Sequence, residues 1–326
     1  MSCQRLLAWW TGPVVVSLGL GARADEPKPV APKTAADGKP EVETKTEPEA
    51  PKFIRLRRDE KQRPLAMETA VVSYIGTGGK HPGVVVDLIG AVHVGDKSYY
   101  AELNKLFESY DVLLYELVAP PGTRIPKEGR KEGNAHPIAM LQDGMKTILE
   151  LEHQLECVDY TKENFVHADM SPDEFAKTMA NRGESFMQMF LRMMGQGMAQ
   201  QAINQQKGDG ATSPDMAILM ALFSRDRARQ MKIAMAEQFE NLEGQMAIFD
   251  GPEGSTIITE RNKKAFDVLQ EQLKAGKKKI GVFYGAGHLP DMEKRLASDF
   301  EMQRDKEQWI SAWKLEKLQP ADAQKK

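Results

Sequence analysis

The chain has 326 residues, with 44 Lys and Arg against 47 Asp and Glu, and 41% of its residues are hydrophobic, a balance typical of a globular, water-soluble protein. This composition excludes collagen-like, coiled-coil-only and wholly disordered chains. The formal net charge of −3 lacks the excess of cations that binds phosphate backbones, so we expect no nucleic-acid partner.

Residues 1–24 have the pattern of a secretory signal peptide. Arg5 precedes an apolar run over residues 6–20, and Ala22-Arg23-Ala24 has the small-x-small form of a cleavage site. The apolar run is shorter than the roughly 20 residues that span a bilayer, so we expect cleavage before Asp25 instead of a membrane anchor. The sequence therefore predicts an exported protein, periplasmic or secreted, without stable insertion into a membrane.

Two polar segments flank the part that we expect to fold. Residues 25–52 are rich in Pro and in charges of both signs, with only Val30 and Val42 as larger apolar groups. Such a segment buries too little surface to offset its ordering entropy, so it is predicted to be a disordered linker. Residues 319–326 are predicted to be a frayed polar tail.

The first half of the folded part has the pattern of an α/β protein. Alternating and β-branched residues predict strands at 53–57, 69–75 and 83–89, with a glycine-rich turn that includes His81. A helix from residue 96 and a buried strand at 111–118 complete a βαβ unit over 84–118. In such units the parallel strands end at one edge of the sheet, where α/β proteins bind ligands.

The middle of the chain, residues 136–246, has helical periodicity and holds most of the 18 methionines. Methionine suits adaptable apolar surfaces, so these residues are expected to form a helical cap over a substrate groove or an ordinary helical core. Within this segment, His167 and Asp169 are either extra polar groups from the cap or, in the favoured interpretation, mark a turn before a helix with Ser171 as its N-cap and Pro172 at its first position.

The α/β pattern returns after this segment. A helix is predicted at 256–275, a strand at 278–284, a helix at 289–297, and a last strand or helix at 300–315. We therefore expect one α/β domain built from residues 53–135 and 247–318. Its mixed, mostly parallel sheet would be flanked by helices and split in sequence by the helical cap at 136–246.

Two copies of a GAxH motif close strands in the two halves of this domain. Gly90-Ala91-Val92-His93 follows the strand at 83–89, and Gly285-Ala286-Gly287-His288 follows the strand at 278–284. Glycines such as Gly90, Gly285 and Gly287 allow backbone conformations and close approaches that would present each histidine at the edge of the sheet. Glu116 ends a third apolar strand and would be costly to bury unpaired.

Two histidines and a carboxylate at strand ends form a plausible metal site with positions left for water and substrate. A metal there would lower the pKa of bound water and polarise a carbonyl, which allows hydrolysis without a protein nucleophile. HExxH, GxSxG and CxxC are absent from the sequence, which disfavours zincin, serine-hydrolase and thiol-redox chemistry. Cys157 is interpreted as a small buried apolar residue, and His136 and His153 as structural.

The ordered set of these motifs resembles the TraB/PrgY/GumN family, which is related to the Tiki metalloproteases and more distantly to ChaN-like haem-binding lipoproteins and erythromycin esterases. The matching stretches are LIGAVHV at 88–94, DVLLYE at 111–116, TERN at 259–262 and VFYGAGHLP at 282–290. Ala91 replaces the Ser or Thr common in the first motif, and the methionine-rich segment matches nothing in the family.

The resemblance implies a split α/β fold with a helical cap and a divalent-metal site. Two histidines and a carboxylate accommodate Zn, Mn, Co or Fe, so the metal stays open. The resemblance assigns His93 and His288 as metal ligands, Glu116 as a third ligand or general base, and Arg261 and Asn262 as polar groups facing the site. Arg261 would hold Glu116 or stabilise an oxyanion. The expected function is metal-dependent hydrolysis of a peptide or small-molecule substrate; the alternative is a ChaN-like protein that binds haem or another flat ligand.

Overall fold

The fold was taken from a computed structural model, which describes residues 52–77, 79–120, 122–123, 125, 149–185, 214–250 and 253–317. The signal peptide predicted at 1–24, almost all of the linker predicted at 25–52 and the tail predicted at 319–326 lie outside these residues, as does His136. No helix within the described ranges has the length and apolar character needed to cross a membrane.

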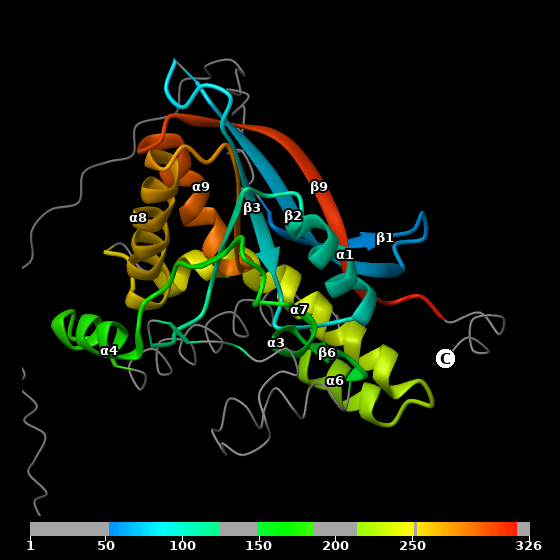
Figure 1. Ribbon diagram of the computed structural model, residues 1–326. Coiled ribbons are helices and arrows are strands. Elements are labelled where there is room, and N and C mark those ends of the chain that lie inside the picture. The colour runs from blue at the N-terminus through cyan, green and yellow to red at the C-terminus, as the bar shows by residue number, and fades with distance from the viewer. Residues whose placement is uncertain are drawn as a thin grey trace, which may run out of the picture. The chain divides into compact units, whose positions relative to one another are not determined.

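Seven described strands form one mixed sheet, and the order of its main path is β1-β2-β3-β8-β5-β7 (Figure 1). The strands are β1 (Ile54–Arg58), β2 (Pro64–Gly76), β3 (Val85–Ala91), β5 (Val112–Tyr115), β7 (Phe165–His167), β8 (Lys279–Gly285) and β9 (Met302–Lys314). The strands β3, β8, β5 and β7 are mutually parallel. The prediction of an α/β fold with a mixed sheet is therefore confirmed.

The antiparallel part of the sheet is organised around the long strand β2. The whole length of β9 pairs with β2, from Ala66 opposite Lys314 to Gly76 opposite Met302. The strands β1 and β3 share the other side of β2, with β1 along its first half and β3 along its second. The C-terminal segment for which the sequence left strand and helix open is thus a strand.

The strand β8 lies between β3 and β5, although it comes more than 160 residues after them in the chain. Its residues Ile280–Tyr284 are all buried, as expected for a parallel strand that has a partner on each side and is covered on both faces. The predicted βαβ unit is present as β3, α1 (Lys97–Phe107) and β5, with β8 inserted between its two strands.

Helices cover both faces of the sheet. Figure 1 shows α8 (Arg261–Lys274) and α9 (Leu289–Ser298) side by side on one face, with α1 on the other. The ring of Phe107 in α1 packs 4.8 Å from that of Phe283 in β8. A π-helical turn, η1 (Thr256–Glu260), leads into α8, and a 3-10 turn, η2 (Ala286–His288), leads from β8 into α9. All these elements belong to one unit, Glu49–Lys326.

The segment predicted as a helical insert is not helical throughout. It contains the helices α3 (Gln154–Cys157), α4 (Pro172–Asn181), α6 (Pro214–Leu222) and α7, the last of which runs on to Asp250 from Arg227. It also contains β6 (Glu152–His153), which pairs with β4 (Val94–Gly95), and β7, which is a strand of the main sheet. The prediction of a helical insert over 136–246 is therefore wrong for these two short segments, because β6 pairs with β4 and β7 pairs with β5.

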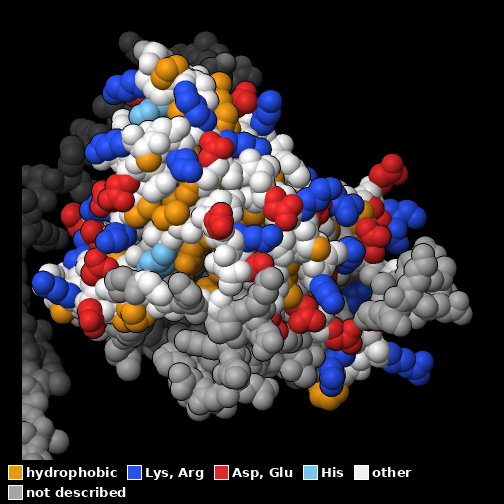
Figure 2. Space-filling model, in the orientation of Figure 1, with side chains coloured by type: hydrophobic (Ala, Val, Ile, Leu, Met, Phe, Trp, Pro, Cys, Tyr) orange, Lys and Arg blue, Asp and Glu red, His pale blue; other side chains and the backbone are white. Residues whose placement is uncertain are grey.

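The helix α7 is attached to the N-terminal strand and to α1. Glu240 accepts hydrogen bonds from the backbone N–H of Leu56 and the guanidinium of Arg58, and Lys232 forms a 3.0 Å ion pair with Asp96 at the start of α1. On the face of the molecule seen in Figure 2, acidic and basic side chains are interspersed, which agrees with the near-neutral composition.

Candidate functional site

The parallel strands bring four polar side chains to one edge of the sheet. Ala91 lies opposite Gly285, and Tyr115 lies opposite both Phe283 and His167. The segments after these strands carry His93 after β3, Glu116 after β5, Asp169 after β7 and His288 after β8. The predicted residues Glu116, His288, Arg261 and Asn262 form one hydrogen-bonded cluster here, with Asp169 as a further member.

Glu116 is held by both of its carboxylate oxygens. Its Oε1 accepts a 2.6 Å hydrogen bond from Nη2 of Arg261, and its Oε2 accepts one of 2.6 Å from the backbone N–H of Gly285. Burial alone would raise the pKa of Glu116, but the nearby His288 and the Arg261 guanidinium hold this pKa well below its usual range. Glu116 is therefore a fixed, ionised carboxylate.

Arg261 is the first residue of α8 and is only 8% exposed. Its Nε donates to Oδ1 of Asp169 at 2.9 Å, and its Nη2 donates to Oδ2 of the same side chain at 2.6 Å. Burial would lower the pKa of Arg261, but the carboxylates of Glu116 and Asp169 raise it further above its ordinary value. The guanidinium thus bridges two carboxylates that come from different strands.

His288 has a tautomer that its neighbours determine. The amide nitrogen of Asn262 donates to the backbone oxygen of His288 at 3.0 Å and to Oδ2 of Asp291 at 2.8 Å, which leaves the Asn262 oxygen 2.7 Å from Nδ1 of His288. Because that oxygen is only an acceptor, Nδ1 carries the proton and Nε2 carries the lone pair. Burial lowers the pKa of His288 to about 4, so the ring is neutral at pH 7.

The lone pair on Nε2 of His288 faces the charged part of the cluster. This nitrogen accepts a 3.4 Å hydrogen bond from Nη1 of Arg261 and lies 3.7 Å from Oε1 of Glu116. A neutral imidazole nitrogen next to a carboxylate oxygen is the pair of groups that borderline divalent metals bind. The second nitrogen of the same ring is hydrogen-bonded, as is usual for a histidine that binds a metal.

His93 differs from His288 because its side chain is exposed. Its backbone oxygen accepts a 2.9 Å hydrogen bond from Gln154, whereas its ring forms no hydrogen bond with another described residue. The ring is close enough to Glu116 to contribute to the lowering of that pKa. Across the described ranges, no three His, Cys, Asp or Glu side chains meet as a ready-made metal-binding group.

Two of the three motif glycines allow close approaches at this edge. A Cβ atom on Gly285 would lie 3.3 Å from Oε2 of Glu116, and one on Gly90 would lie 3.3 Å from the backbone oxygen of Ala70. The missing side chain at Gly285 therefore lets its N–H reach the Glu116 carboxylate. Gly287 lies within η2.

Asp169 is a site residue for which the sequence analysis favoured a role in a turn over one as a polar group from the cap. The turn and the helix after it are confirmed, since Ser171 and Glu174 form a capping box with Pro172 at the first helical position. However, Asp169 is a buried residue whose side chain points back to Arg261. The sequence contained only a weak signal, since Phe165-Val166 ahead of Asp169 is a shorter apolar run than the one that ends at Glu116.

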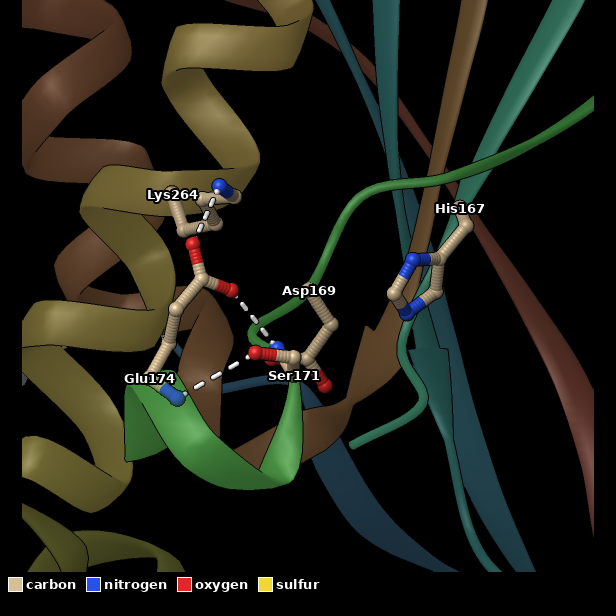
Figure 3. A pocket seen from close by; sticks show the side chains of 5 residues that line it. All are labelled: His167, Asp169, Ser171, Glu174 and Lys264. Atoms are coloured by element: carbon tan, nitrogen blue, oxygen red, sulfur yellow. Dashed lines mark hydrogen bonds and ion pairs between the residues drawn. The ribbon is translucent and has the colours of Figure 1, made fainter. Parts of the chain in front are cut away.

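A pocket of about 450 Å³ adjoins the cluster on the side of Asp169 (Figure 3). It is lined by His167, Asp169, Ser171, Glu174 and Lys264. Lys264 forms a 3.0 Å ion pair with Glu174, and the ring of His167 is 2.6 Å from the backbone oxygen of Leu117, next to Glu116. The pocket thus gives open, polar space beside the buried charges.

Comparison with known proteins adds no relative: no protein-family model, curated protein or solved structure matches this chain.

Proposed function

We propose that this chain is an exported, divalent-metal-dependent hydrolase of the TraB/GumN and Tiki type that cleaves peptide bonds. The observation that carries the proposal is a neutral histidine, His288, whose Nε2 lone pair lies 3.7 Å from the ionised Glu116 at the carboxyl ends of parallel strands and accepts a hydrogen bond from Arg261. The sequence resemblance supplies the reaction class, and the geometry of these two groups supplies a reason why a metal would bind.

The donor atoms suit a divalent cation such as Zn, Mn or Co, which would bind Nε2 of His288 in place of the Arg261 hydrogen bond. His288 offers a nitrogen lone pair, and Glu116 offers a carboxylate with a lowered pKa. Both are already held in place by Asn262 and by the N–H of Gly285. His93, the exposed histidine, would complete the ligand set from the solvent side. The metal would supply a water of lowered pKa and a polarised carbonyl.

The remaining groups of the cluster have positioning roles in this proposal. Asn262 fixes the tautomer of His288 through the 2.7 Å contact with Nδ1. Arg261 holds Glu116 and directs Nη1 toward the same space as Nε2 of His288, where it could stabilise developing negative charge on a substrate oxygen. The polar pocket of about 450 Å³ beside Asp169 is the proposed approach for the substrate.

The test compares metal binding and peptide hydrolysis in purified full-length protein and three single variants. His288→Ala and His93→Ala remove the proposed ligands, and His81→Asn is the control, since His81 lies in a turn at a φ of 52° that asparagine tolerates. We expect one equivalent of metal and cleavage of a mixed peptide library in the wild type and in His81→Asn, and neither in the two ligand variants.

Hydrolysis that persists unchanged in His288→Ala, with the variant folded by circular dichroism, would contradict the proposal. Absence of binding in the wild type to Zn, Mn and Co would also contradict it. In that case haem titration would test the alternative of a ligand-binding protein, for which a Soret band is the expected signal.

A further inference from the structure

One arginine in this cluster is shared by two carboxylates, and the two do not hold it equally. Asp169 receives two hydrogen bonds from Arg261, through Nε and Nη2, whereas Glu116 receives one, through Nη2. The Asp169 side chain is 0% exposed and that of Glu116 is 14% exposed. A two-point contact fixes the plane of a guanidinium, and a single contact does not.

Asp169 is also anchored more firmly than its position after a three-residue strand suggests. The backbone N–H of Ala168 donates to the oxygen of Tyr115 in β5, and the hydroxyl of Tyr284 in β8 donates to the oxygen of Ala168. In addition, the backbone N–H of Met170 donates to Oδ1 of Asp169 at 2.7 Å. Two strands of the sheet therefore fix the segment that carries the carboxylate.

We infer that Asp169 is a positioning residue that holds Arg261 independently of Glu116, and so allows Glu116 to change partners without displacing the arginine. This inference deepens the proposed function and rests on it for its consequence, since Glu116 must turn a carboxylate oxygen to a metal or a proton during the reaction. With Asp169 present, Arg261 keeps a counter-charge and its orientation when Glu116 is occupied elsewhere.

The first test needs no metal and no substrate. It measures the exchange with water of the Nε–H proton of Arg261 by NMR in the metal-free, full-length protein. We expect a protected signal in the wild type and in Glu116→Gln, because Nε donates to Asp169 and not to Glu116. In Asp169→Asn we expect exchange to be about tenfold faster or more, because a charge-assisted hydrogen bond is weakened. Asp173→Asn, an exposed aspartate four residues along, is the matched control.

The outcome in Glu116→Gln decides the inference even if Asp169→Asn fails to fold. If Glu116→Gln also releases the Nε–H proton, Glu116 holds the arginine and the inference is wrong. If the proton stays protected in a folded Asp169→Asn variant, Asp169 is not the residue that holds Arg261, and the inference is again wrong.

The second test measures the affinity for Mn²⁺ by titration calorimetry. We expect Asp169→Asn to bind about 10 to 100 times more weakly than the wild type and Asp173→Asn to bind equally well, the size expected for residues behind metal ligands. A purely structural Asp169 would lower the unfolding midpoint but leave the affinity of the folded protein unchanged. A wild type that binds no metal refutes the proposed function, while the exchange experiment still decides the role of Asp169.

Discussion

The motifs Gly90-Ala91-Val92-His93 and Gly285-Ala286-Gly287-His288 begin at the ends of neighbouring parallel strands, one residue out of register, so that Ala91 lies opposite Gly285. His288 is 5% exposed and hydrogen-bonded through its ring, whereas His93 is an exposed residue whose ring has no hydrogen-bond partner among the described residues. The same four-residue pattern thus produces one histidine whose ring is oriented by a hydrogen bond and one whose ring is not oriented by any described residue.

The difference comes from the element that the chain enters after each motif. After β8 the chain enters η2 and then α9, with Pro290 in the first turn, so the His288 ring faces the start of α8. After β3 the chain passes through a bend at His93 and forms β4, which pairs with β6. The motif brings a histidine to the edge of the sheet, but the neighbouring element decides whether its ring is oriented. The asymmetry suits a site with one preset ligand and one that completes it from the solvent side.

The largest expected effect comes from removing the positive charge of Arg261, which lies between the carboxylates of Glu116 and Asp169. Arg261→Leu leaves the carboxylates of Glu116 and Asp169 without their shared cation, which should lower the free energy of unfolding by about 3 to 5 kcal/mol. Urea denaturation measures the change. Arg63→Leu, which breaks an exposed ion pair with Asp59, should leave the midpoint unchanged. Equal stability of both variants would show that the buried charges are hydrated and not mutually dependent.

A smaller effect is expected from Asn262, which orients only one of the two histidines. At pH 7, ring ¹⁵N spectra should show His288 as the neutral Nδ1–H tautomer, whereas no described residue fixes a tautomer at His93. Asn262→Ala should abolish this difference and lower the free energy of unfolding by about 1 to 3 kcal/mol, because it leaves buried polar groups unpaired. An Nε2–H tautomer at His288 in the wild type would contradict the assignment of the lone pair.

Periodicity alone was enough to predict most of the elements that carry the site. The strands at 69–75 and 278–284 and the helix entered through Pro290 are confirmed, as is the cap of α4 at Ser171. These elements have strong local signals: β-branched alternation, an uninterrupted apolar run and a capping box. The convergence of Glu116, Arg261 and His288 was predicted from repeated motifs at strand ends and from the family resemblance.

The features that sequence reasoning missed depend on contacts distant in the chain. Asp169 meets Arg261 across 92 positions, and its strand, Phe165–His167, is three half-buried residues without alternation. Likewise, no local pattern places β8 between β3 and β5. The strand β9 was ambiguous because a run of charged residues, from Arg304 to Glu307, hides its period of two.

The smallest expected effect is a difference in stability between Gly90→Ala and Gly285→Ala, which change the first glycine of each motif. In Gly90→Ala the new Cβ would lie 3.3 Å from the backbone oxygen of Ala70 and 3.5 Å from that of Phe53, atoms that cannot move without the sheet. In Gly285→Ala it would lie 3.3 Å from Oε2 of Glu116, the end of a side chain. We therefore expect Gly90→Ala to lower the free energy of unfolding by about 1 to 2 kcal/mol and Gly285→Ala to lower it less.

Gly285→Ala should displace the carboxylate of Glu116 and leave the backbone of the sheet in place. Displacing Oε2 of Glu116 weakens its hydrogen bond with the N–H of residue 285, which should shift the ¹³C signal of the Glu116 carboxylate in Gly285→Ala and leave it in place in Gly90→Ala. If the carboxylate signal moved equally in both variants, the two motifs would be mechanically coupled through the sheet. The difference between the rings of His288 and His93 would then be caused by the whole edge of the sheet and not by the elements that follow β8 and β3.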